Sequence, residues 1–576
     1  MCLTVTRFLD LLLTSAGQST RGMTTGEPGD PIRRTWPEIH VVARRMAADL
    51  VRRGVTPGTS VALLAGEPTL IAPAAQAVWL AGGSVTMLHQ PTPRTDLGVW
   101  AEDTVTVLTM VGAGLVLLGP PFGPLADVLT ARGIQVCEIP ELGADADSFE
   151  LEPALPDVTV SEDDAALLQL TSGSTAEPKA VRITHRNLYA NLTAMIATAE
   201  LRPERDVMVS WLPLFHDMGM VGFLTIPMAA GLELVTVTPA DFLTRPLLWP
   251  ELISRYGGTV TAAPNFAYAM LGRLLRHAAD DSLDLTTLRF ALNGAEPIDP
   301  DAVDSFTTAG ARFGLRRECV VAAYGMAETA LGVSFAPLDT GLQVDVVDAE
   351  ALEGSRRAVP AREVAGPSVD ADPGPSVRRF PLLGPPLPGL TARVVDEEGA
   401  VLGDRDVGAI QLRGDSVTPG YLTVDGPVPA QDAEGWLDTG DQGYLADGTV
   451  VVCGRLKDVI IMGGRNIYPT DIERAAGQVD GVRAGNVVAV RLDVGSGVGS
   501  TRRESFAVVV ESRKAGDADA EATIRKDVTG RVVDAVGARP ARVVIVAPGS
   551  LPKTPSGKLR RAATRSLAAV PQGQSV

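Results

Sequence analysis

Hydrophobic residues spaced as on one face of a helix alternate with short β-branched runs along the first part of the chain. Residues 36–53 have the helical spacing, and residues 60–64 and 104–110 have the composition of strands. This alternation is typical of a domain in which helices pack on sheets. Because it continues to about residue 335, it predicts a large α/β domain of layered sheets and helices.

The composition and periodicity of the sequence change twice after this region. Residues 338–379 are rich in Pro, Gly, Asp and Arg with little periodicity, which indicates an insertion or long excursion. A β-rich part then follows, with strands expected at 391–396, 409–413 and 449–453. A hinge-like segment at 454–458 precedes a small α/β unit, with strands expected at 486–492, 505–511 and 542–546.

Length supports a division into two domains. At 576 residues the chain is too long for one ordinary core. We expect an N-terminal domain over residues 1–456, which includes the excursion at 338–379, and a mobile C-terminal domain over residues 457–576.

The charge balance and the cysteines limit the partners and the compartment. A formal net charge of −18 repels nucleic acid phosphates and anionic lipid head groups, so neither is expected as a large-area partner. The four cysteines, Cys2, Cys137, Cys319 and Cys453, form no CxxC pair, which argues against a disulfide framework or a structural zinc cluster. A reducing, cytoplasmic setting is therefore predicted.

We expect no signal peptide and no integral membrane segment. Asp10 interrupts the apolar run at 8–13, and no convincing cleavage site follows it. The best candidate for a membrane span, at 110–129, is broken by Gly119-Pro120-Pro121, and a spanning helix needs roughly 18 uninterrupted apolar residues.

The strongest local signal is a loop after an apolar run at 168–170. It is dense in Gly and hydroxyl residues and ends in a lysine: Thr171, Ser172, Gly173, Ser174, Thr175 and Lys179. Such a loop can offer backbone N–H groups and hydroxyls to phosphate oxygens. It lacks the Walker spacing, and taken alone it is more often an ordinary surface turn.

Five further motifs follow the loop along the chain. They are Asn293-Gly294-Ala295-Glu296-Pro297, Ala323-Tyr324-Gly325-Met326-Ala327-Glu328-Thr329, Gly435-Trp436-Leu437-Asp438-Thr439-Gly440-Asp441, Gly454-Arg455-Leu456-Lys457-Asp458 and Leu551-Pro552-Lys553-Thr554-Pro555-Ser556-Gly557-Lys558. Together with the loop they resemble the signature motifs of the adenylate-forming superfamily, which contains acyl-CoA synthetases, peptide-synthetase adenylation domains and luciferases. Six motifs in this order are highly specific. The resemblance implies an enzyme that joins a carboxylic acid to AMP, with ATP and Mg²⁺ as cofactors.

The resemblance also assigns roles to single residues. The loop residues would bind phosphate, and the adenine-facing residues would be Asn293, Gly294, Ala295, Glu296, Ala323, Tyr324, Gly325 and Met326. Glu328 would contact Mg²⁺, because carboxylate oxygen suits a hard cation. Asp441 and Arg455 would hold the ribose hydroxyls, and Lys457 lies in the hinge motif. Each role has an alternative. Tyr324 could be a core tyrosine and Asp441 part of a surface turn, and Glu328 and Arg455 could be solvated charges.

The chemistry requires neutralisation of charge. When a carboxylate attacks the α-phosphorus of ATP, two anions meet, so the enzyme must supply positive charge and alignment. The resemblance makes Lys558 the catalytic cation, because an ammonium delivered to the developing charge stabilises only the transition state. The alternative is a solvated basic tail, since Lys558 opens the run Lys558-Leu559-Arg560-Arg561.

Several features resemble the fatty acyl-AMP ligases within the superfamily. The stretches at 211–220 and 263–268 are similar to motifs of that group, and His216 would border the acyl pocket or, alternatively, cap a helix. Ala327 stands where many acyl-CoA synthetases have Thr. The excursion at 338–379 resembles an insertion that would restrain the small domain and disfavour a step with CoA. Ile467, in contrast, is a residue type more typical of CoA ligases at this position.

We therefore expect a fatty acid to be converted to acyl-AMP and pyrophosphate. The acyl group would then pass to the phosphopantetheine thiol of an acyl carrier protein or carrier domain, in a polyketide or nonribosomal peptide pathway. Three alternatives stay open: a fatty acyl-CoA synthetase, an amino-acid or aryl-acid adenylating enzyme, and an inactive nucleotide-binding scaffold.

Overall fold

The structure is a computed structural model that describes residues 5–91, 96–143, 158–171, 178–361, 377–462, 465–494, 503–553 and 559–569. The chain divides into two compact units. The larger unit contains Met1–Leu342, Gly384–Thr391 and Leu412–Leu437, and the smaller unit contains Gln343–Leu383, Ala392–Gln411 and Asp438–Val576. The predicted α/β class is confirmed. Because this division follows packing alone, the predicted domain boundary between residues 456 and 457 stays a prediction.

One eight-stranded sheet of the larger unit has the order β14-β13-β12-β11-β9-β10-β1-β2. Its strands are β1 (Gly22–Thr25), β2 (Ile32–Thr35), β9 (Val207–Ser210), β10 (Glu233–Thr236), β11 (Val260–Ala263), β12 (Phe290–Asn293), β13 (Val320–Gly325) and β14 (Gly332–Phe335). The six strands from β13 to β1 in this order are parallel, so their carboxyl ends lie at one edge. Ligands of open α/β sheets bind outside such an edge.

A second eight-stranded sheet of the larger unit has the order β20-β19-β8-β7-β4-β3-β5-β6. Its strands are β3 (Ser60–Leu64), β4 (Ser84–Met87), β5 (Ala113–Leu118), β6 (Gln135–Glu138), β7 (Ala165–Thr171), β8 (Lys179–Thr184), β19 (Gly420–Thr423) and β20 (Gly426–Pro429). β3, predicted at 60–64, is buried at every position, as expected for a central strand covered on both faces.

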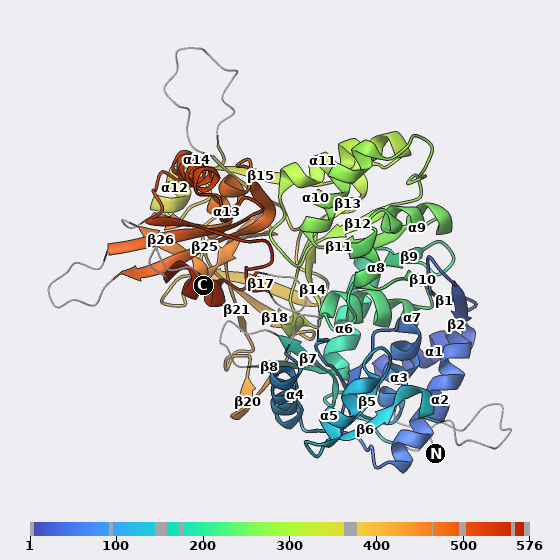
Figure 1. Cartoon of the computed structure of the whole chain (residues 1–576). Helices are drawn as coiled ribbons and strands as arrows, with labels where there is room; N and C mark the ends of the chain where they lie inside the picture. Colours follow the sequence, from blue (N-terminus) through green and yellow to red (C-terminus); the bar gives the residue numbers. More distant parts are fainter. Residues whose placement is uncertain are drawn as a thin grey trace. The chain divides into compact units, whose positions relative to one another are not determined.

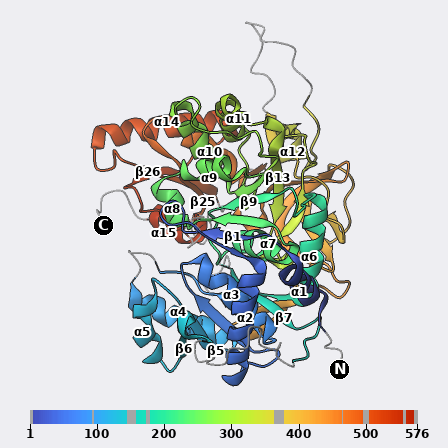
Figure 2. The same ribbon diagram turned by 90° about the vertical axis from the view of Figure 1, so that its right-hand side faces the viewer.

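Helices of the larger unit pack around these sheets (Figures 1 and 2). They are α1 (Arg7–Gln18), α2 (Trp36–Arg52), α3 (Pro68–Leu80), α4 (Leu97–Val111), α5 (Ala126–Thr130), α6 (His185–Thr198), α7 (Ile226–Ala230), α8 (Pro239–Thr244), α9 (Leu248–Tyr256), α10 (Asn265–Leu274) and α11 (Pro300–Gly310). The predicted helix at 36–53 is confirmed as α2. It begins with a capping box, in which Thr35 and Glu38 satisfy each other's backbone N–H groups.

The strand predicted at 104–110 is wrong, because these residues belong to α4. Asp96 caps the amino end of this helix by accepting hydrogen bonds from the backbone N–H groups of Gly98 and Val99. Gly112 ends it in the left-handed conformation. Burial of one helical face overrides the strand preference of the valines and threonines.

The smaller unit contains most of the excursion, from Gln343 onward, and its described residues have more regular structure than the sequence predicted. β15 (Val344–Asp348) pairs antiparallel with β16 (Val377–Pro381), and α12 (Ala349–Gly354) follows β15. A buried cluster includes Val347 and Leu352 from the excursion, Phe380 directly after it, and Tyr444 and Tyr468. The part of the excursion around β15 and α12 is therefore packed into the core of this unit.

The remaining elements include three sheets and three helices. A four-stranded sheet has the order β17 (Leu390–Val395), β18 (Gly408–Gly414), β21 (Leu437–Ala446) and β22 (Thr449–Arg455). β23 (Ile460–Met462) pairs with β24 (Arg465–Ile467). The last sheet has the order β25 (Val482–Val494), β26 (Arg503–Ser512) and β27 (Arg542–Val546), and the helices are α13 (Pro469–Gly477), α14 (Ala518–Val536) and α15 (Arg561–Ala569). These strands confirm all six predicted after residue 390.

The helices in the described part of the chain include none that is both long enough and apolar enough to cross a membrane.

Candidate active site

Three predicted motifs meet at the carboxyl edge of the first sheet. Residues 211–216 follow β9, residues 294–296 follow β12, and β13 ends at Gly325. The parallel order β13-β12-β11-β9 makes these strand ends neighbours. The topology thus brings together segments that lie far apart in the sequence.

The turn after β12 holds its backbone close to β13. An added Cβ on Gly294 would lie 3.1 Å from the carbonyl oxygen of Ala323, and Ala295 has a φ of +68°. Asn293 is fully buried and donates through Nδ2 to Asn265 Oδ1 at 3.2 Å, whereas its Oδ1 has no hydrogen-bond partner among the described residues. Glu296 Oε1 accepts from the backbone N–H of Phe266 at 2.6 Å. Glu296 therefore fixes the start of α10, and Asn293 keeps an acceptor for a ligand.

The turn after β13 is equally tight. The Tyr324 hydroxyl lies 3.8 Å from Met326 Sδ, to which it donates, and Met326 N donates to the carbonyl of Leu331 at 2.8 Å. An added Cβ on Gly325 would lie only 2.5 Å from that same carbonyl oxygen. Glycine at this position lets the chain close the turn that carries Glu328.

Glu328 forms a small charged cluster with Lys179 and Tyr421. Glu328 Oε1 lies 3.5 Å from Lys179 Nζ and accepts from the Tyr421 hydroxyl at 3.2 Å. Its backbone carbonyl accepts from Thr418 N at 2.8 Å. The side chain of Glu328 is 13% exposed, so its carboxylate is accessible to a ligand while being held in place. Sequence analysis missed Tyr421, which lies outside the six motifs.

The described residues contain no cluster of three or more His, Cys, Asp or Glu that could hold a metal ion. A single carboxylate still fits Mg²⁺, because this ion keeps several waters and is often held by one or two carboxylates together with substrate phosphates. Glu328 is the residue that would hold it.

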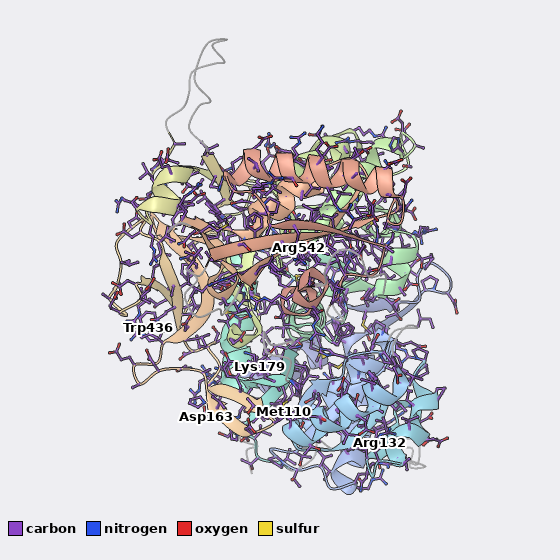
Figure 3. All side chains as sticks on the ribbon, turned by 60° about the vertical axis from the view of Figure 1, so that its left-hand side comes forward. Met110, Arg132, Asp163, Lys179, Trp436 and Arg542 are labelled. Carbon is purple, nitrogen blue, oxygen red and sulfur yellow. The ribbon has the colours of Figure 1, made fainter. Side chains whose placement is uncertain are left out.

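The predicted phosphate loop joins β7 and β8. Thr171 and Lys179 are Cα partners at the ends of these strands, and Lys179 is labelled in Figure 3. Ser172, Gly173, Ser174 and Thr175 lie outside the described residues. Thr171 Oγ1 is buried and has no hydrogen-bond partner in the described part of the chain. The strands thus bring the lysine back beside the start of the loop.

His216 pairs with the next residue in the chain. Its Nδ1 lies 2.6 Å from Asp217 Oδ1, and Asp217 caps the π-helix Met218–Thr225 by accepting from Met218 N at 2.7 Å. The structure shows the helix-capping contact that was the alternative for this pair. Phe215 is linked to β7 because its carbonyl accepts from Gln169 Nε2 at 3.0 Å.

His89 is a second histidine beside this segment, and sequence analysis missed it. Its ring lies 5.8 Å from the ring of Phe215 in an edge-on contact. Burial, with a smaller effect from the nearby His216, lowers the pKa of His89 to about 4, so its imidazole is neutral at pH 7. The feature that could have identified His89 is its position after β4, which is the parallel neighbour of β7.

The predicted ribose pair lies in the smaller unit. Asp441 on β21 and Arg455 on β22 are Cα partners, and Arg455 Nε lies 2.9 Å from Asp441 Oδ1. Arg455 Nη1 also donates to the carbonyl of Thr439 at 3.3 Å. Lys457 lies in the short 3₁₀ turn Leu456–Asp458, directly after β22.

Lys558 lies outside the described residues, but the base of its loop is well defined. Lys553 and Leu559 form an isolated β-bridge. The carboxylate of Glu511, which is fully buried, accepts from Gly549 N at 2.8 Å and Leu551 N at 3.1 Å. The opposite oxygen of this carboxylate accepts from Arg483 at 2.5 Å. The segment leading to Lys558 is thus anchored to the last sheet.

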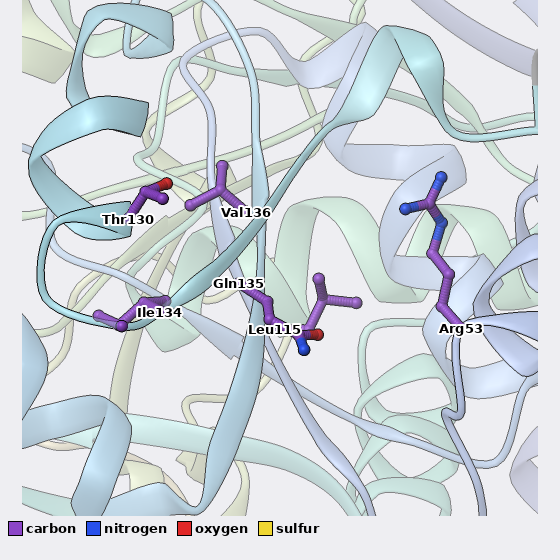
Figure 4. Close-up of a pocket in the computed structure, with 7 residues that line it drawn as sticks. Arg53, Leu115, Thr130, Ile134, Gln135 and Val136 are labelled. Carbon is purple, nitrogen blue, oxygen red and sulfur yellow. The ribbon is translucent and has the colours of Figure 1, made fainter.

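A shallow pocket lies elsewhere in the larger unit, and Figure 4 shows its lining. It contains none of the predicted site residues: it is lined by Arg53, Leu115, Thr130, Gly133, Ile134, Gln135 and Val136. Ile134 precedes β6 and Leu115 lies early in β5, so the pocket is beside the amino ends of these strands. The predicted phosphate loop, in contrast, follows the carboxyl end of β7.

Comparison with known proteins decides the family. The family model described as AMP-binding enzyme matches residues 18–422, which is more than half of the chain. The chain belongs to the AMP-binding enzyme family.

Relatives of this AMP-binding enzyme cover most of its length. A Mycobacterium tuberculosis protein provisionally named as a ligase is 55% identical over 98% of this chain and 100% of its own length. A Caulobacter vibrioides protein provisionally named as an acyl-CoA synthetase is 34% identical over 92% of this chain and 88% of its own.

Among solved structures, one from a study of fatty acyl-adenylate ligases of Escherichia coli and Legionella pneumophila is 31% identical. It covers 98% of this chain and 97% of its own with a TM-score of 0.84. The resemblance to fatty acyl-AMP ligases and the prediction of an enzyme are confirmed. The residue assignments within this AMP-binding enzyme stay predictions.

Proposed function

We propose that this AMP-binding enzyme activates a fatty acid with ATP, giving acyl-AMP and pyrophosphate. It then transfers the acyl group to the phosphopantetheine thiol of an acyl carrier protein. The observation that carries the proposal is the cluster of Glu328, Lys179 and Tyr421 beside the β7–β8 hairpin. It combines a carboxylate suited to Mg²⁺ with an ammonium suited to phosphate. The similarity to fatty acyl-adenylate ligase structures supports a fatty acid as the substrate.

In the first step, separate groups of residues bind the phosphates, the adenine, the ribose and Mg²⁺. Lys179 and the loop from Thr171 to Thr175 bind the phosphates, and the backbone turn at Asn293–Glu296 lies against the adenine. Asp441 and Arg455 hold the ribose. Glu328 holds Mg²⁺, which neutralises phosphate charge when it is bound.

The bond-forming step joins a carboxylate oxygen of the acid to the α-phosphorus and breaks the bond to the pyrophosphate oxygen. Lys558 donates hydrogen bonds to the oxygens on which negative charge grows, so it acts on the transition state more than on the bound substrates. His216, held by Asp217, borders the space for the acyl chain.

An ion-pair network in the smaller unit supports a carrier protein over free CoA as acceptor. Glu353 of α12 is 2% exposed and binds Arg378 of β16 at 2.7 Å and Arg465 of β24 at 2.7 Å. Arg378 also pairs with Asp471 of α13 at 2.9 Å. The excursion is thereby tied to residues after the hinge motif. Such ties oppose a rotation of the C-terminal residues that a second half-reaction with CoA would require.

A fatty acyl-CoA synthetase is the second candidate. The Caulobacter relative carries that provisional name, and Ile467 is closer to the habit of CoA ligases. The two functions differ in the acceptor of the acyl group and share the adenylation step.

The proposed location of the reaction is the cytoplasm. Cys137, Cys319 and Cys453 are buried free thiols, which supports a reducing environment. A polyketide or nonribosomal peptide pathway is the proposed destination of the acyl group.

The adenylation step is tested by exchange of labelled pyrophosphate into ATP. The purified protein is mixed with ATP and Mg²⁺ and a panel of fatty, amino and aryl acids. Exchange that depends on a fatty acid supports the proposal. Exchange with only amino or aryl acids, or ATP binding without any exchange, contradicts it.

A further inference from the structure

Tyr421 lies at the centre of the charged cluster although its strand is far along the chain. β19 pairs antiparallel with β8, and Tyr421 is the Cα partner of Val181. Val181 and Lys179 are two residues apart on β8, so their side chains leave the same face of the sheet. Tyr421 and Lys179 are therefore diagonal cross-strand neighbours, a separation that long side chains can bridge.

The tyrosine contacts both members of the ion pair with different atoms. Its hydroxyl donates to Glu328 Oε1 at 3.2 Å. Its ring faces Lys179, whose Nζ lies 4.0 Å from the ring centroid. Lys179 Nζ in turn lies 3.5 Å from Glu328 Oε1. The residue is half-buried, so its ring is not simply part of a closed core.

These contacts have unequal effects on the two oxygens of Glu328. Within the described residues, every hydrogen bond and ion pair of this carboxylate falls on Oε1. A hydrogen bond from the tyrosine hydroxyl fixes the plane of the carboxylate and leaves Oε2 as the oxygen for a hard cation. The ring attracts the ammonium of Lys179 independently of the carboxylate.

We propose that Tyr421 is a positioning residue that orients Glu328 for Mg²⁺ through its hydroxyl and holds Lys179 for phosphate through its ring. The inference rests on the proposed function, because it takes Glu328 as the metal contact and Lys179 as a phosphate contact. Without ATP the ammonium stays beside Glu328 Oε1. When Mg²⁺ and phosphate enter, the ring keeps the ammonium in place while its partner changes from carboxylate to phosphate.

Two substitutions separate the two contacts. Tyr421→Phe removes the hydroxyl and keeps the ring, whereas Tyr421→Leu removes both. The measurement is the dissociation constant of ATP by calorimetry, with excess Mg²⁺ and with a chelator, in the absence of any acid. The ratio of the dissociation constant with chelator to the dissociation constant with Mg²⁺ reports how strongly the metal and the nucleotide are coupled.

We expect Tyr421→Phe to reduce this ratio by about threefold to tenfold, the range for the net contribution of one typical hydrogen bond, while ATP binding with chelator is unchanged. Tyr421→Leu should reduce the ratio equally and also weaken ATP binding with chelator, by about twofold to fivefold. The matched control is Tyr189→Phe on α6, whose ring lies 4.8 Å from the guanidinium of Arg7 and away from the cluster. Thermal unfolding of each variant monitors its fold.

An unchanged ratio in Tyr421→Phe overturns the inference. A wild-type protein that binds ATP equally well with Mg²⁺ and with chelator overturns it too. Equal weakening with metal and with chelator in Tyr421→Phe also overturns it, because that pattern indicates a general structural role. Since no acid is present, the result is independent of the acid substrate. Failure of the proposed function appears separately, as pyrophosphate exchange that no fatty acid supports.

Discussion

Asp441 and Arg455 face each other across the β21–β22 hairpin, with Arg455 Nε 2.9 Å from Asp441 Oδ1. The carboxylate is only 6% exposed, while the arginine is 49% exposed. Asp441 N also donates to Thr439 Oγ1 at 3.1 Å. Arg455 on the neighbouring strand thus orients the carboxylate, and the hydrogen bond to Thr439 fixes the backbone of Asp441. A fixed carboxylate suits the proposed role of accepting hydrogen bonds from the two ribose hydroxyls.

Asp441→Asn should weaken ATP binding without unfolding the protein. The amide keeps the size of the side chain but loses the charge that strengthens hydrogen bonds from the ribose hydroxyls, so we expect about a tenfold to hundredfold higher dissociation constant. Calorimetric titration with ATP measures this change. Asp127→Asn, at an exposed position of α5, is the control. Equal affinity of Asp441→Asn and the control would remove Asp441 from the nucleotide site.

Lys558→Ala should abolish adenylation while the fold stays intact. The substitution removes the cation that acts on the transition state, so we expect at least about a hundredfold slower pyrophosphate exchange. Circular dichroism monitors the fold, and Lys526→Ala on the exposed face of α14 is the matched control. Full activity of Lys558→Ala would remove this residue from the mechanism.

Glu353→Gln should increase the acylation of free CoA relative to acyl-AMP. It weakens the ion pairs with Arg378 and Arg465 but keeps hydrogen-bonding atoms at the same position. Loosening a buried pair costs about 3 kcal/mol or less when a polar group remains, so folding should survive. The ratio of acyl-CoA to acyl-AMP is measured by mass spectrometry, with Glu350→Gln on the exposed side of α12 as control. An unchanged ratio would speak against the restraining role of the excursion.

His185 should make the folded state less stable in mild acid. This residue is fully buried with its Nδ1 3.0 Å from Thr6 Oγ1, and burial lowers its pKa from 6.5 to about 4. Below pH 6.5 the imidazole of His185 binds a proton in the unfolded chain but stays neutral in the folded chain. Stability therefore falls as the pH drops from about 6.5 to about 4.

Between pH 7 and pH 5 this histidine should cost about 2 kcal/mol of unfolding free energy. Urea denaturation at both pH values measures it, and His185→Gln should show a smaller pH effect than the wild type. His277→Gln, at an exposed position, should match the wild type. The same pH effect in all three proteins would contradict the prediction.

Much of the fold follows from local patterns in the sequence. β27 was predicted with the correct bounds, and α2 within one residue, because hydrophobic periodicity and capping residues act locally. The strand at 104–110 was wrong because valine and threonine favour strands, whereas the cap at Asp96 and the burial of one face select a helix. The pairing of β15 with β16 was missed because its partners are separated by a long segment of Pro and Gly.

Motifs in the sequence name most of the candidate site residues. Lys179, Glu328, Asp441 and Arg455 were named from motifs, and the structure gives each a defined ionic partner. Tyr421 was not predictable, because its role depends on the pairing of β19 with β8, which only the tertiary fold determines.

The most direct test of the central claim is product analysis with a ladder of fatty acids. The purified protein is mixed with ATP and Mg²⁺ alone, with added CoA, and with a phosphopantetheinylated acyl carrier protein, and the products are resolved by mass spectrometry. The account predicts acyl-AMP in the first two mixtures and acyl carrier protein thioester in the third. Rapid formation of acyl-CoA in the second mixture, or no acyl-AMP from any fatty acid, would contradict it.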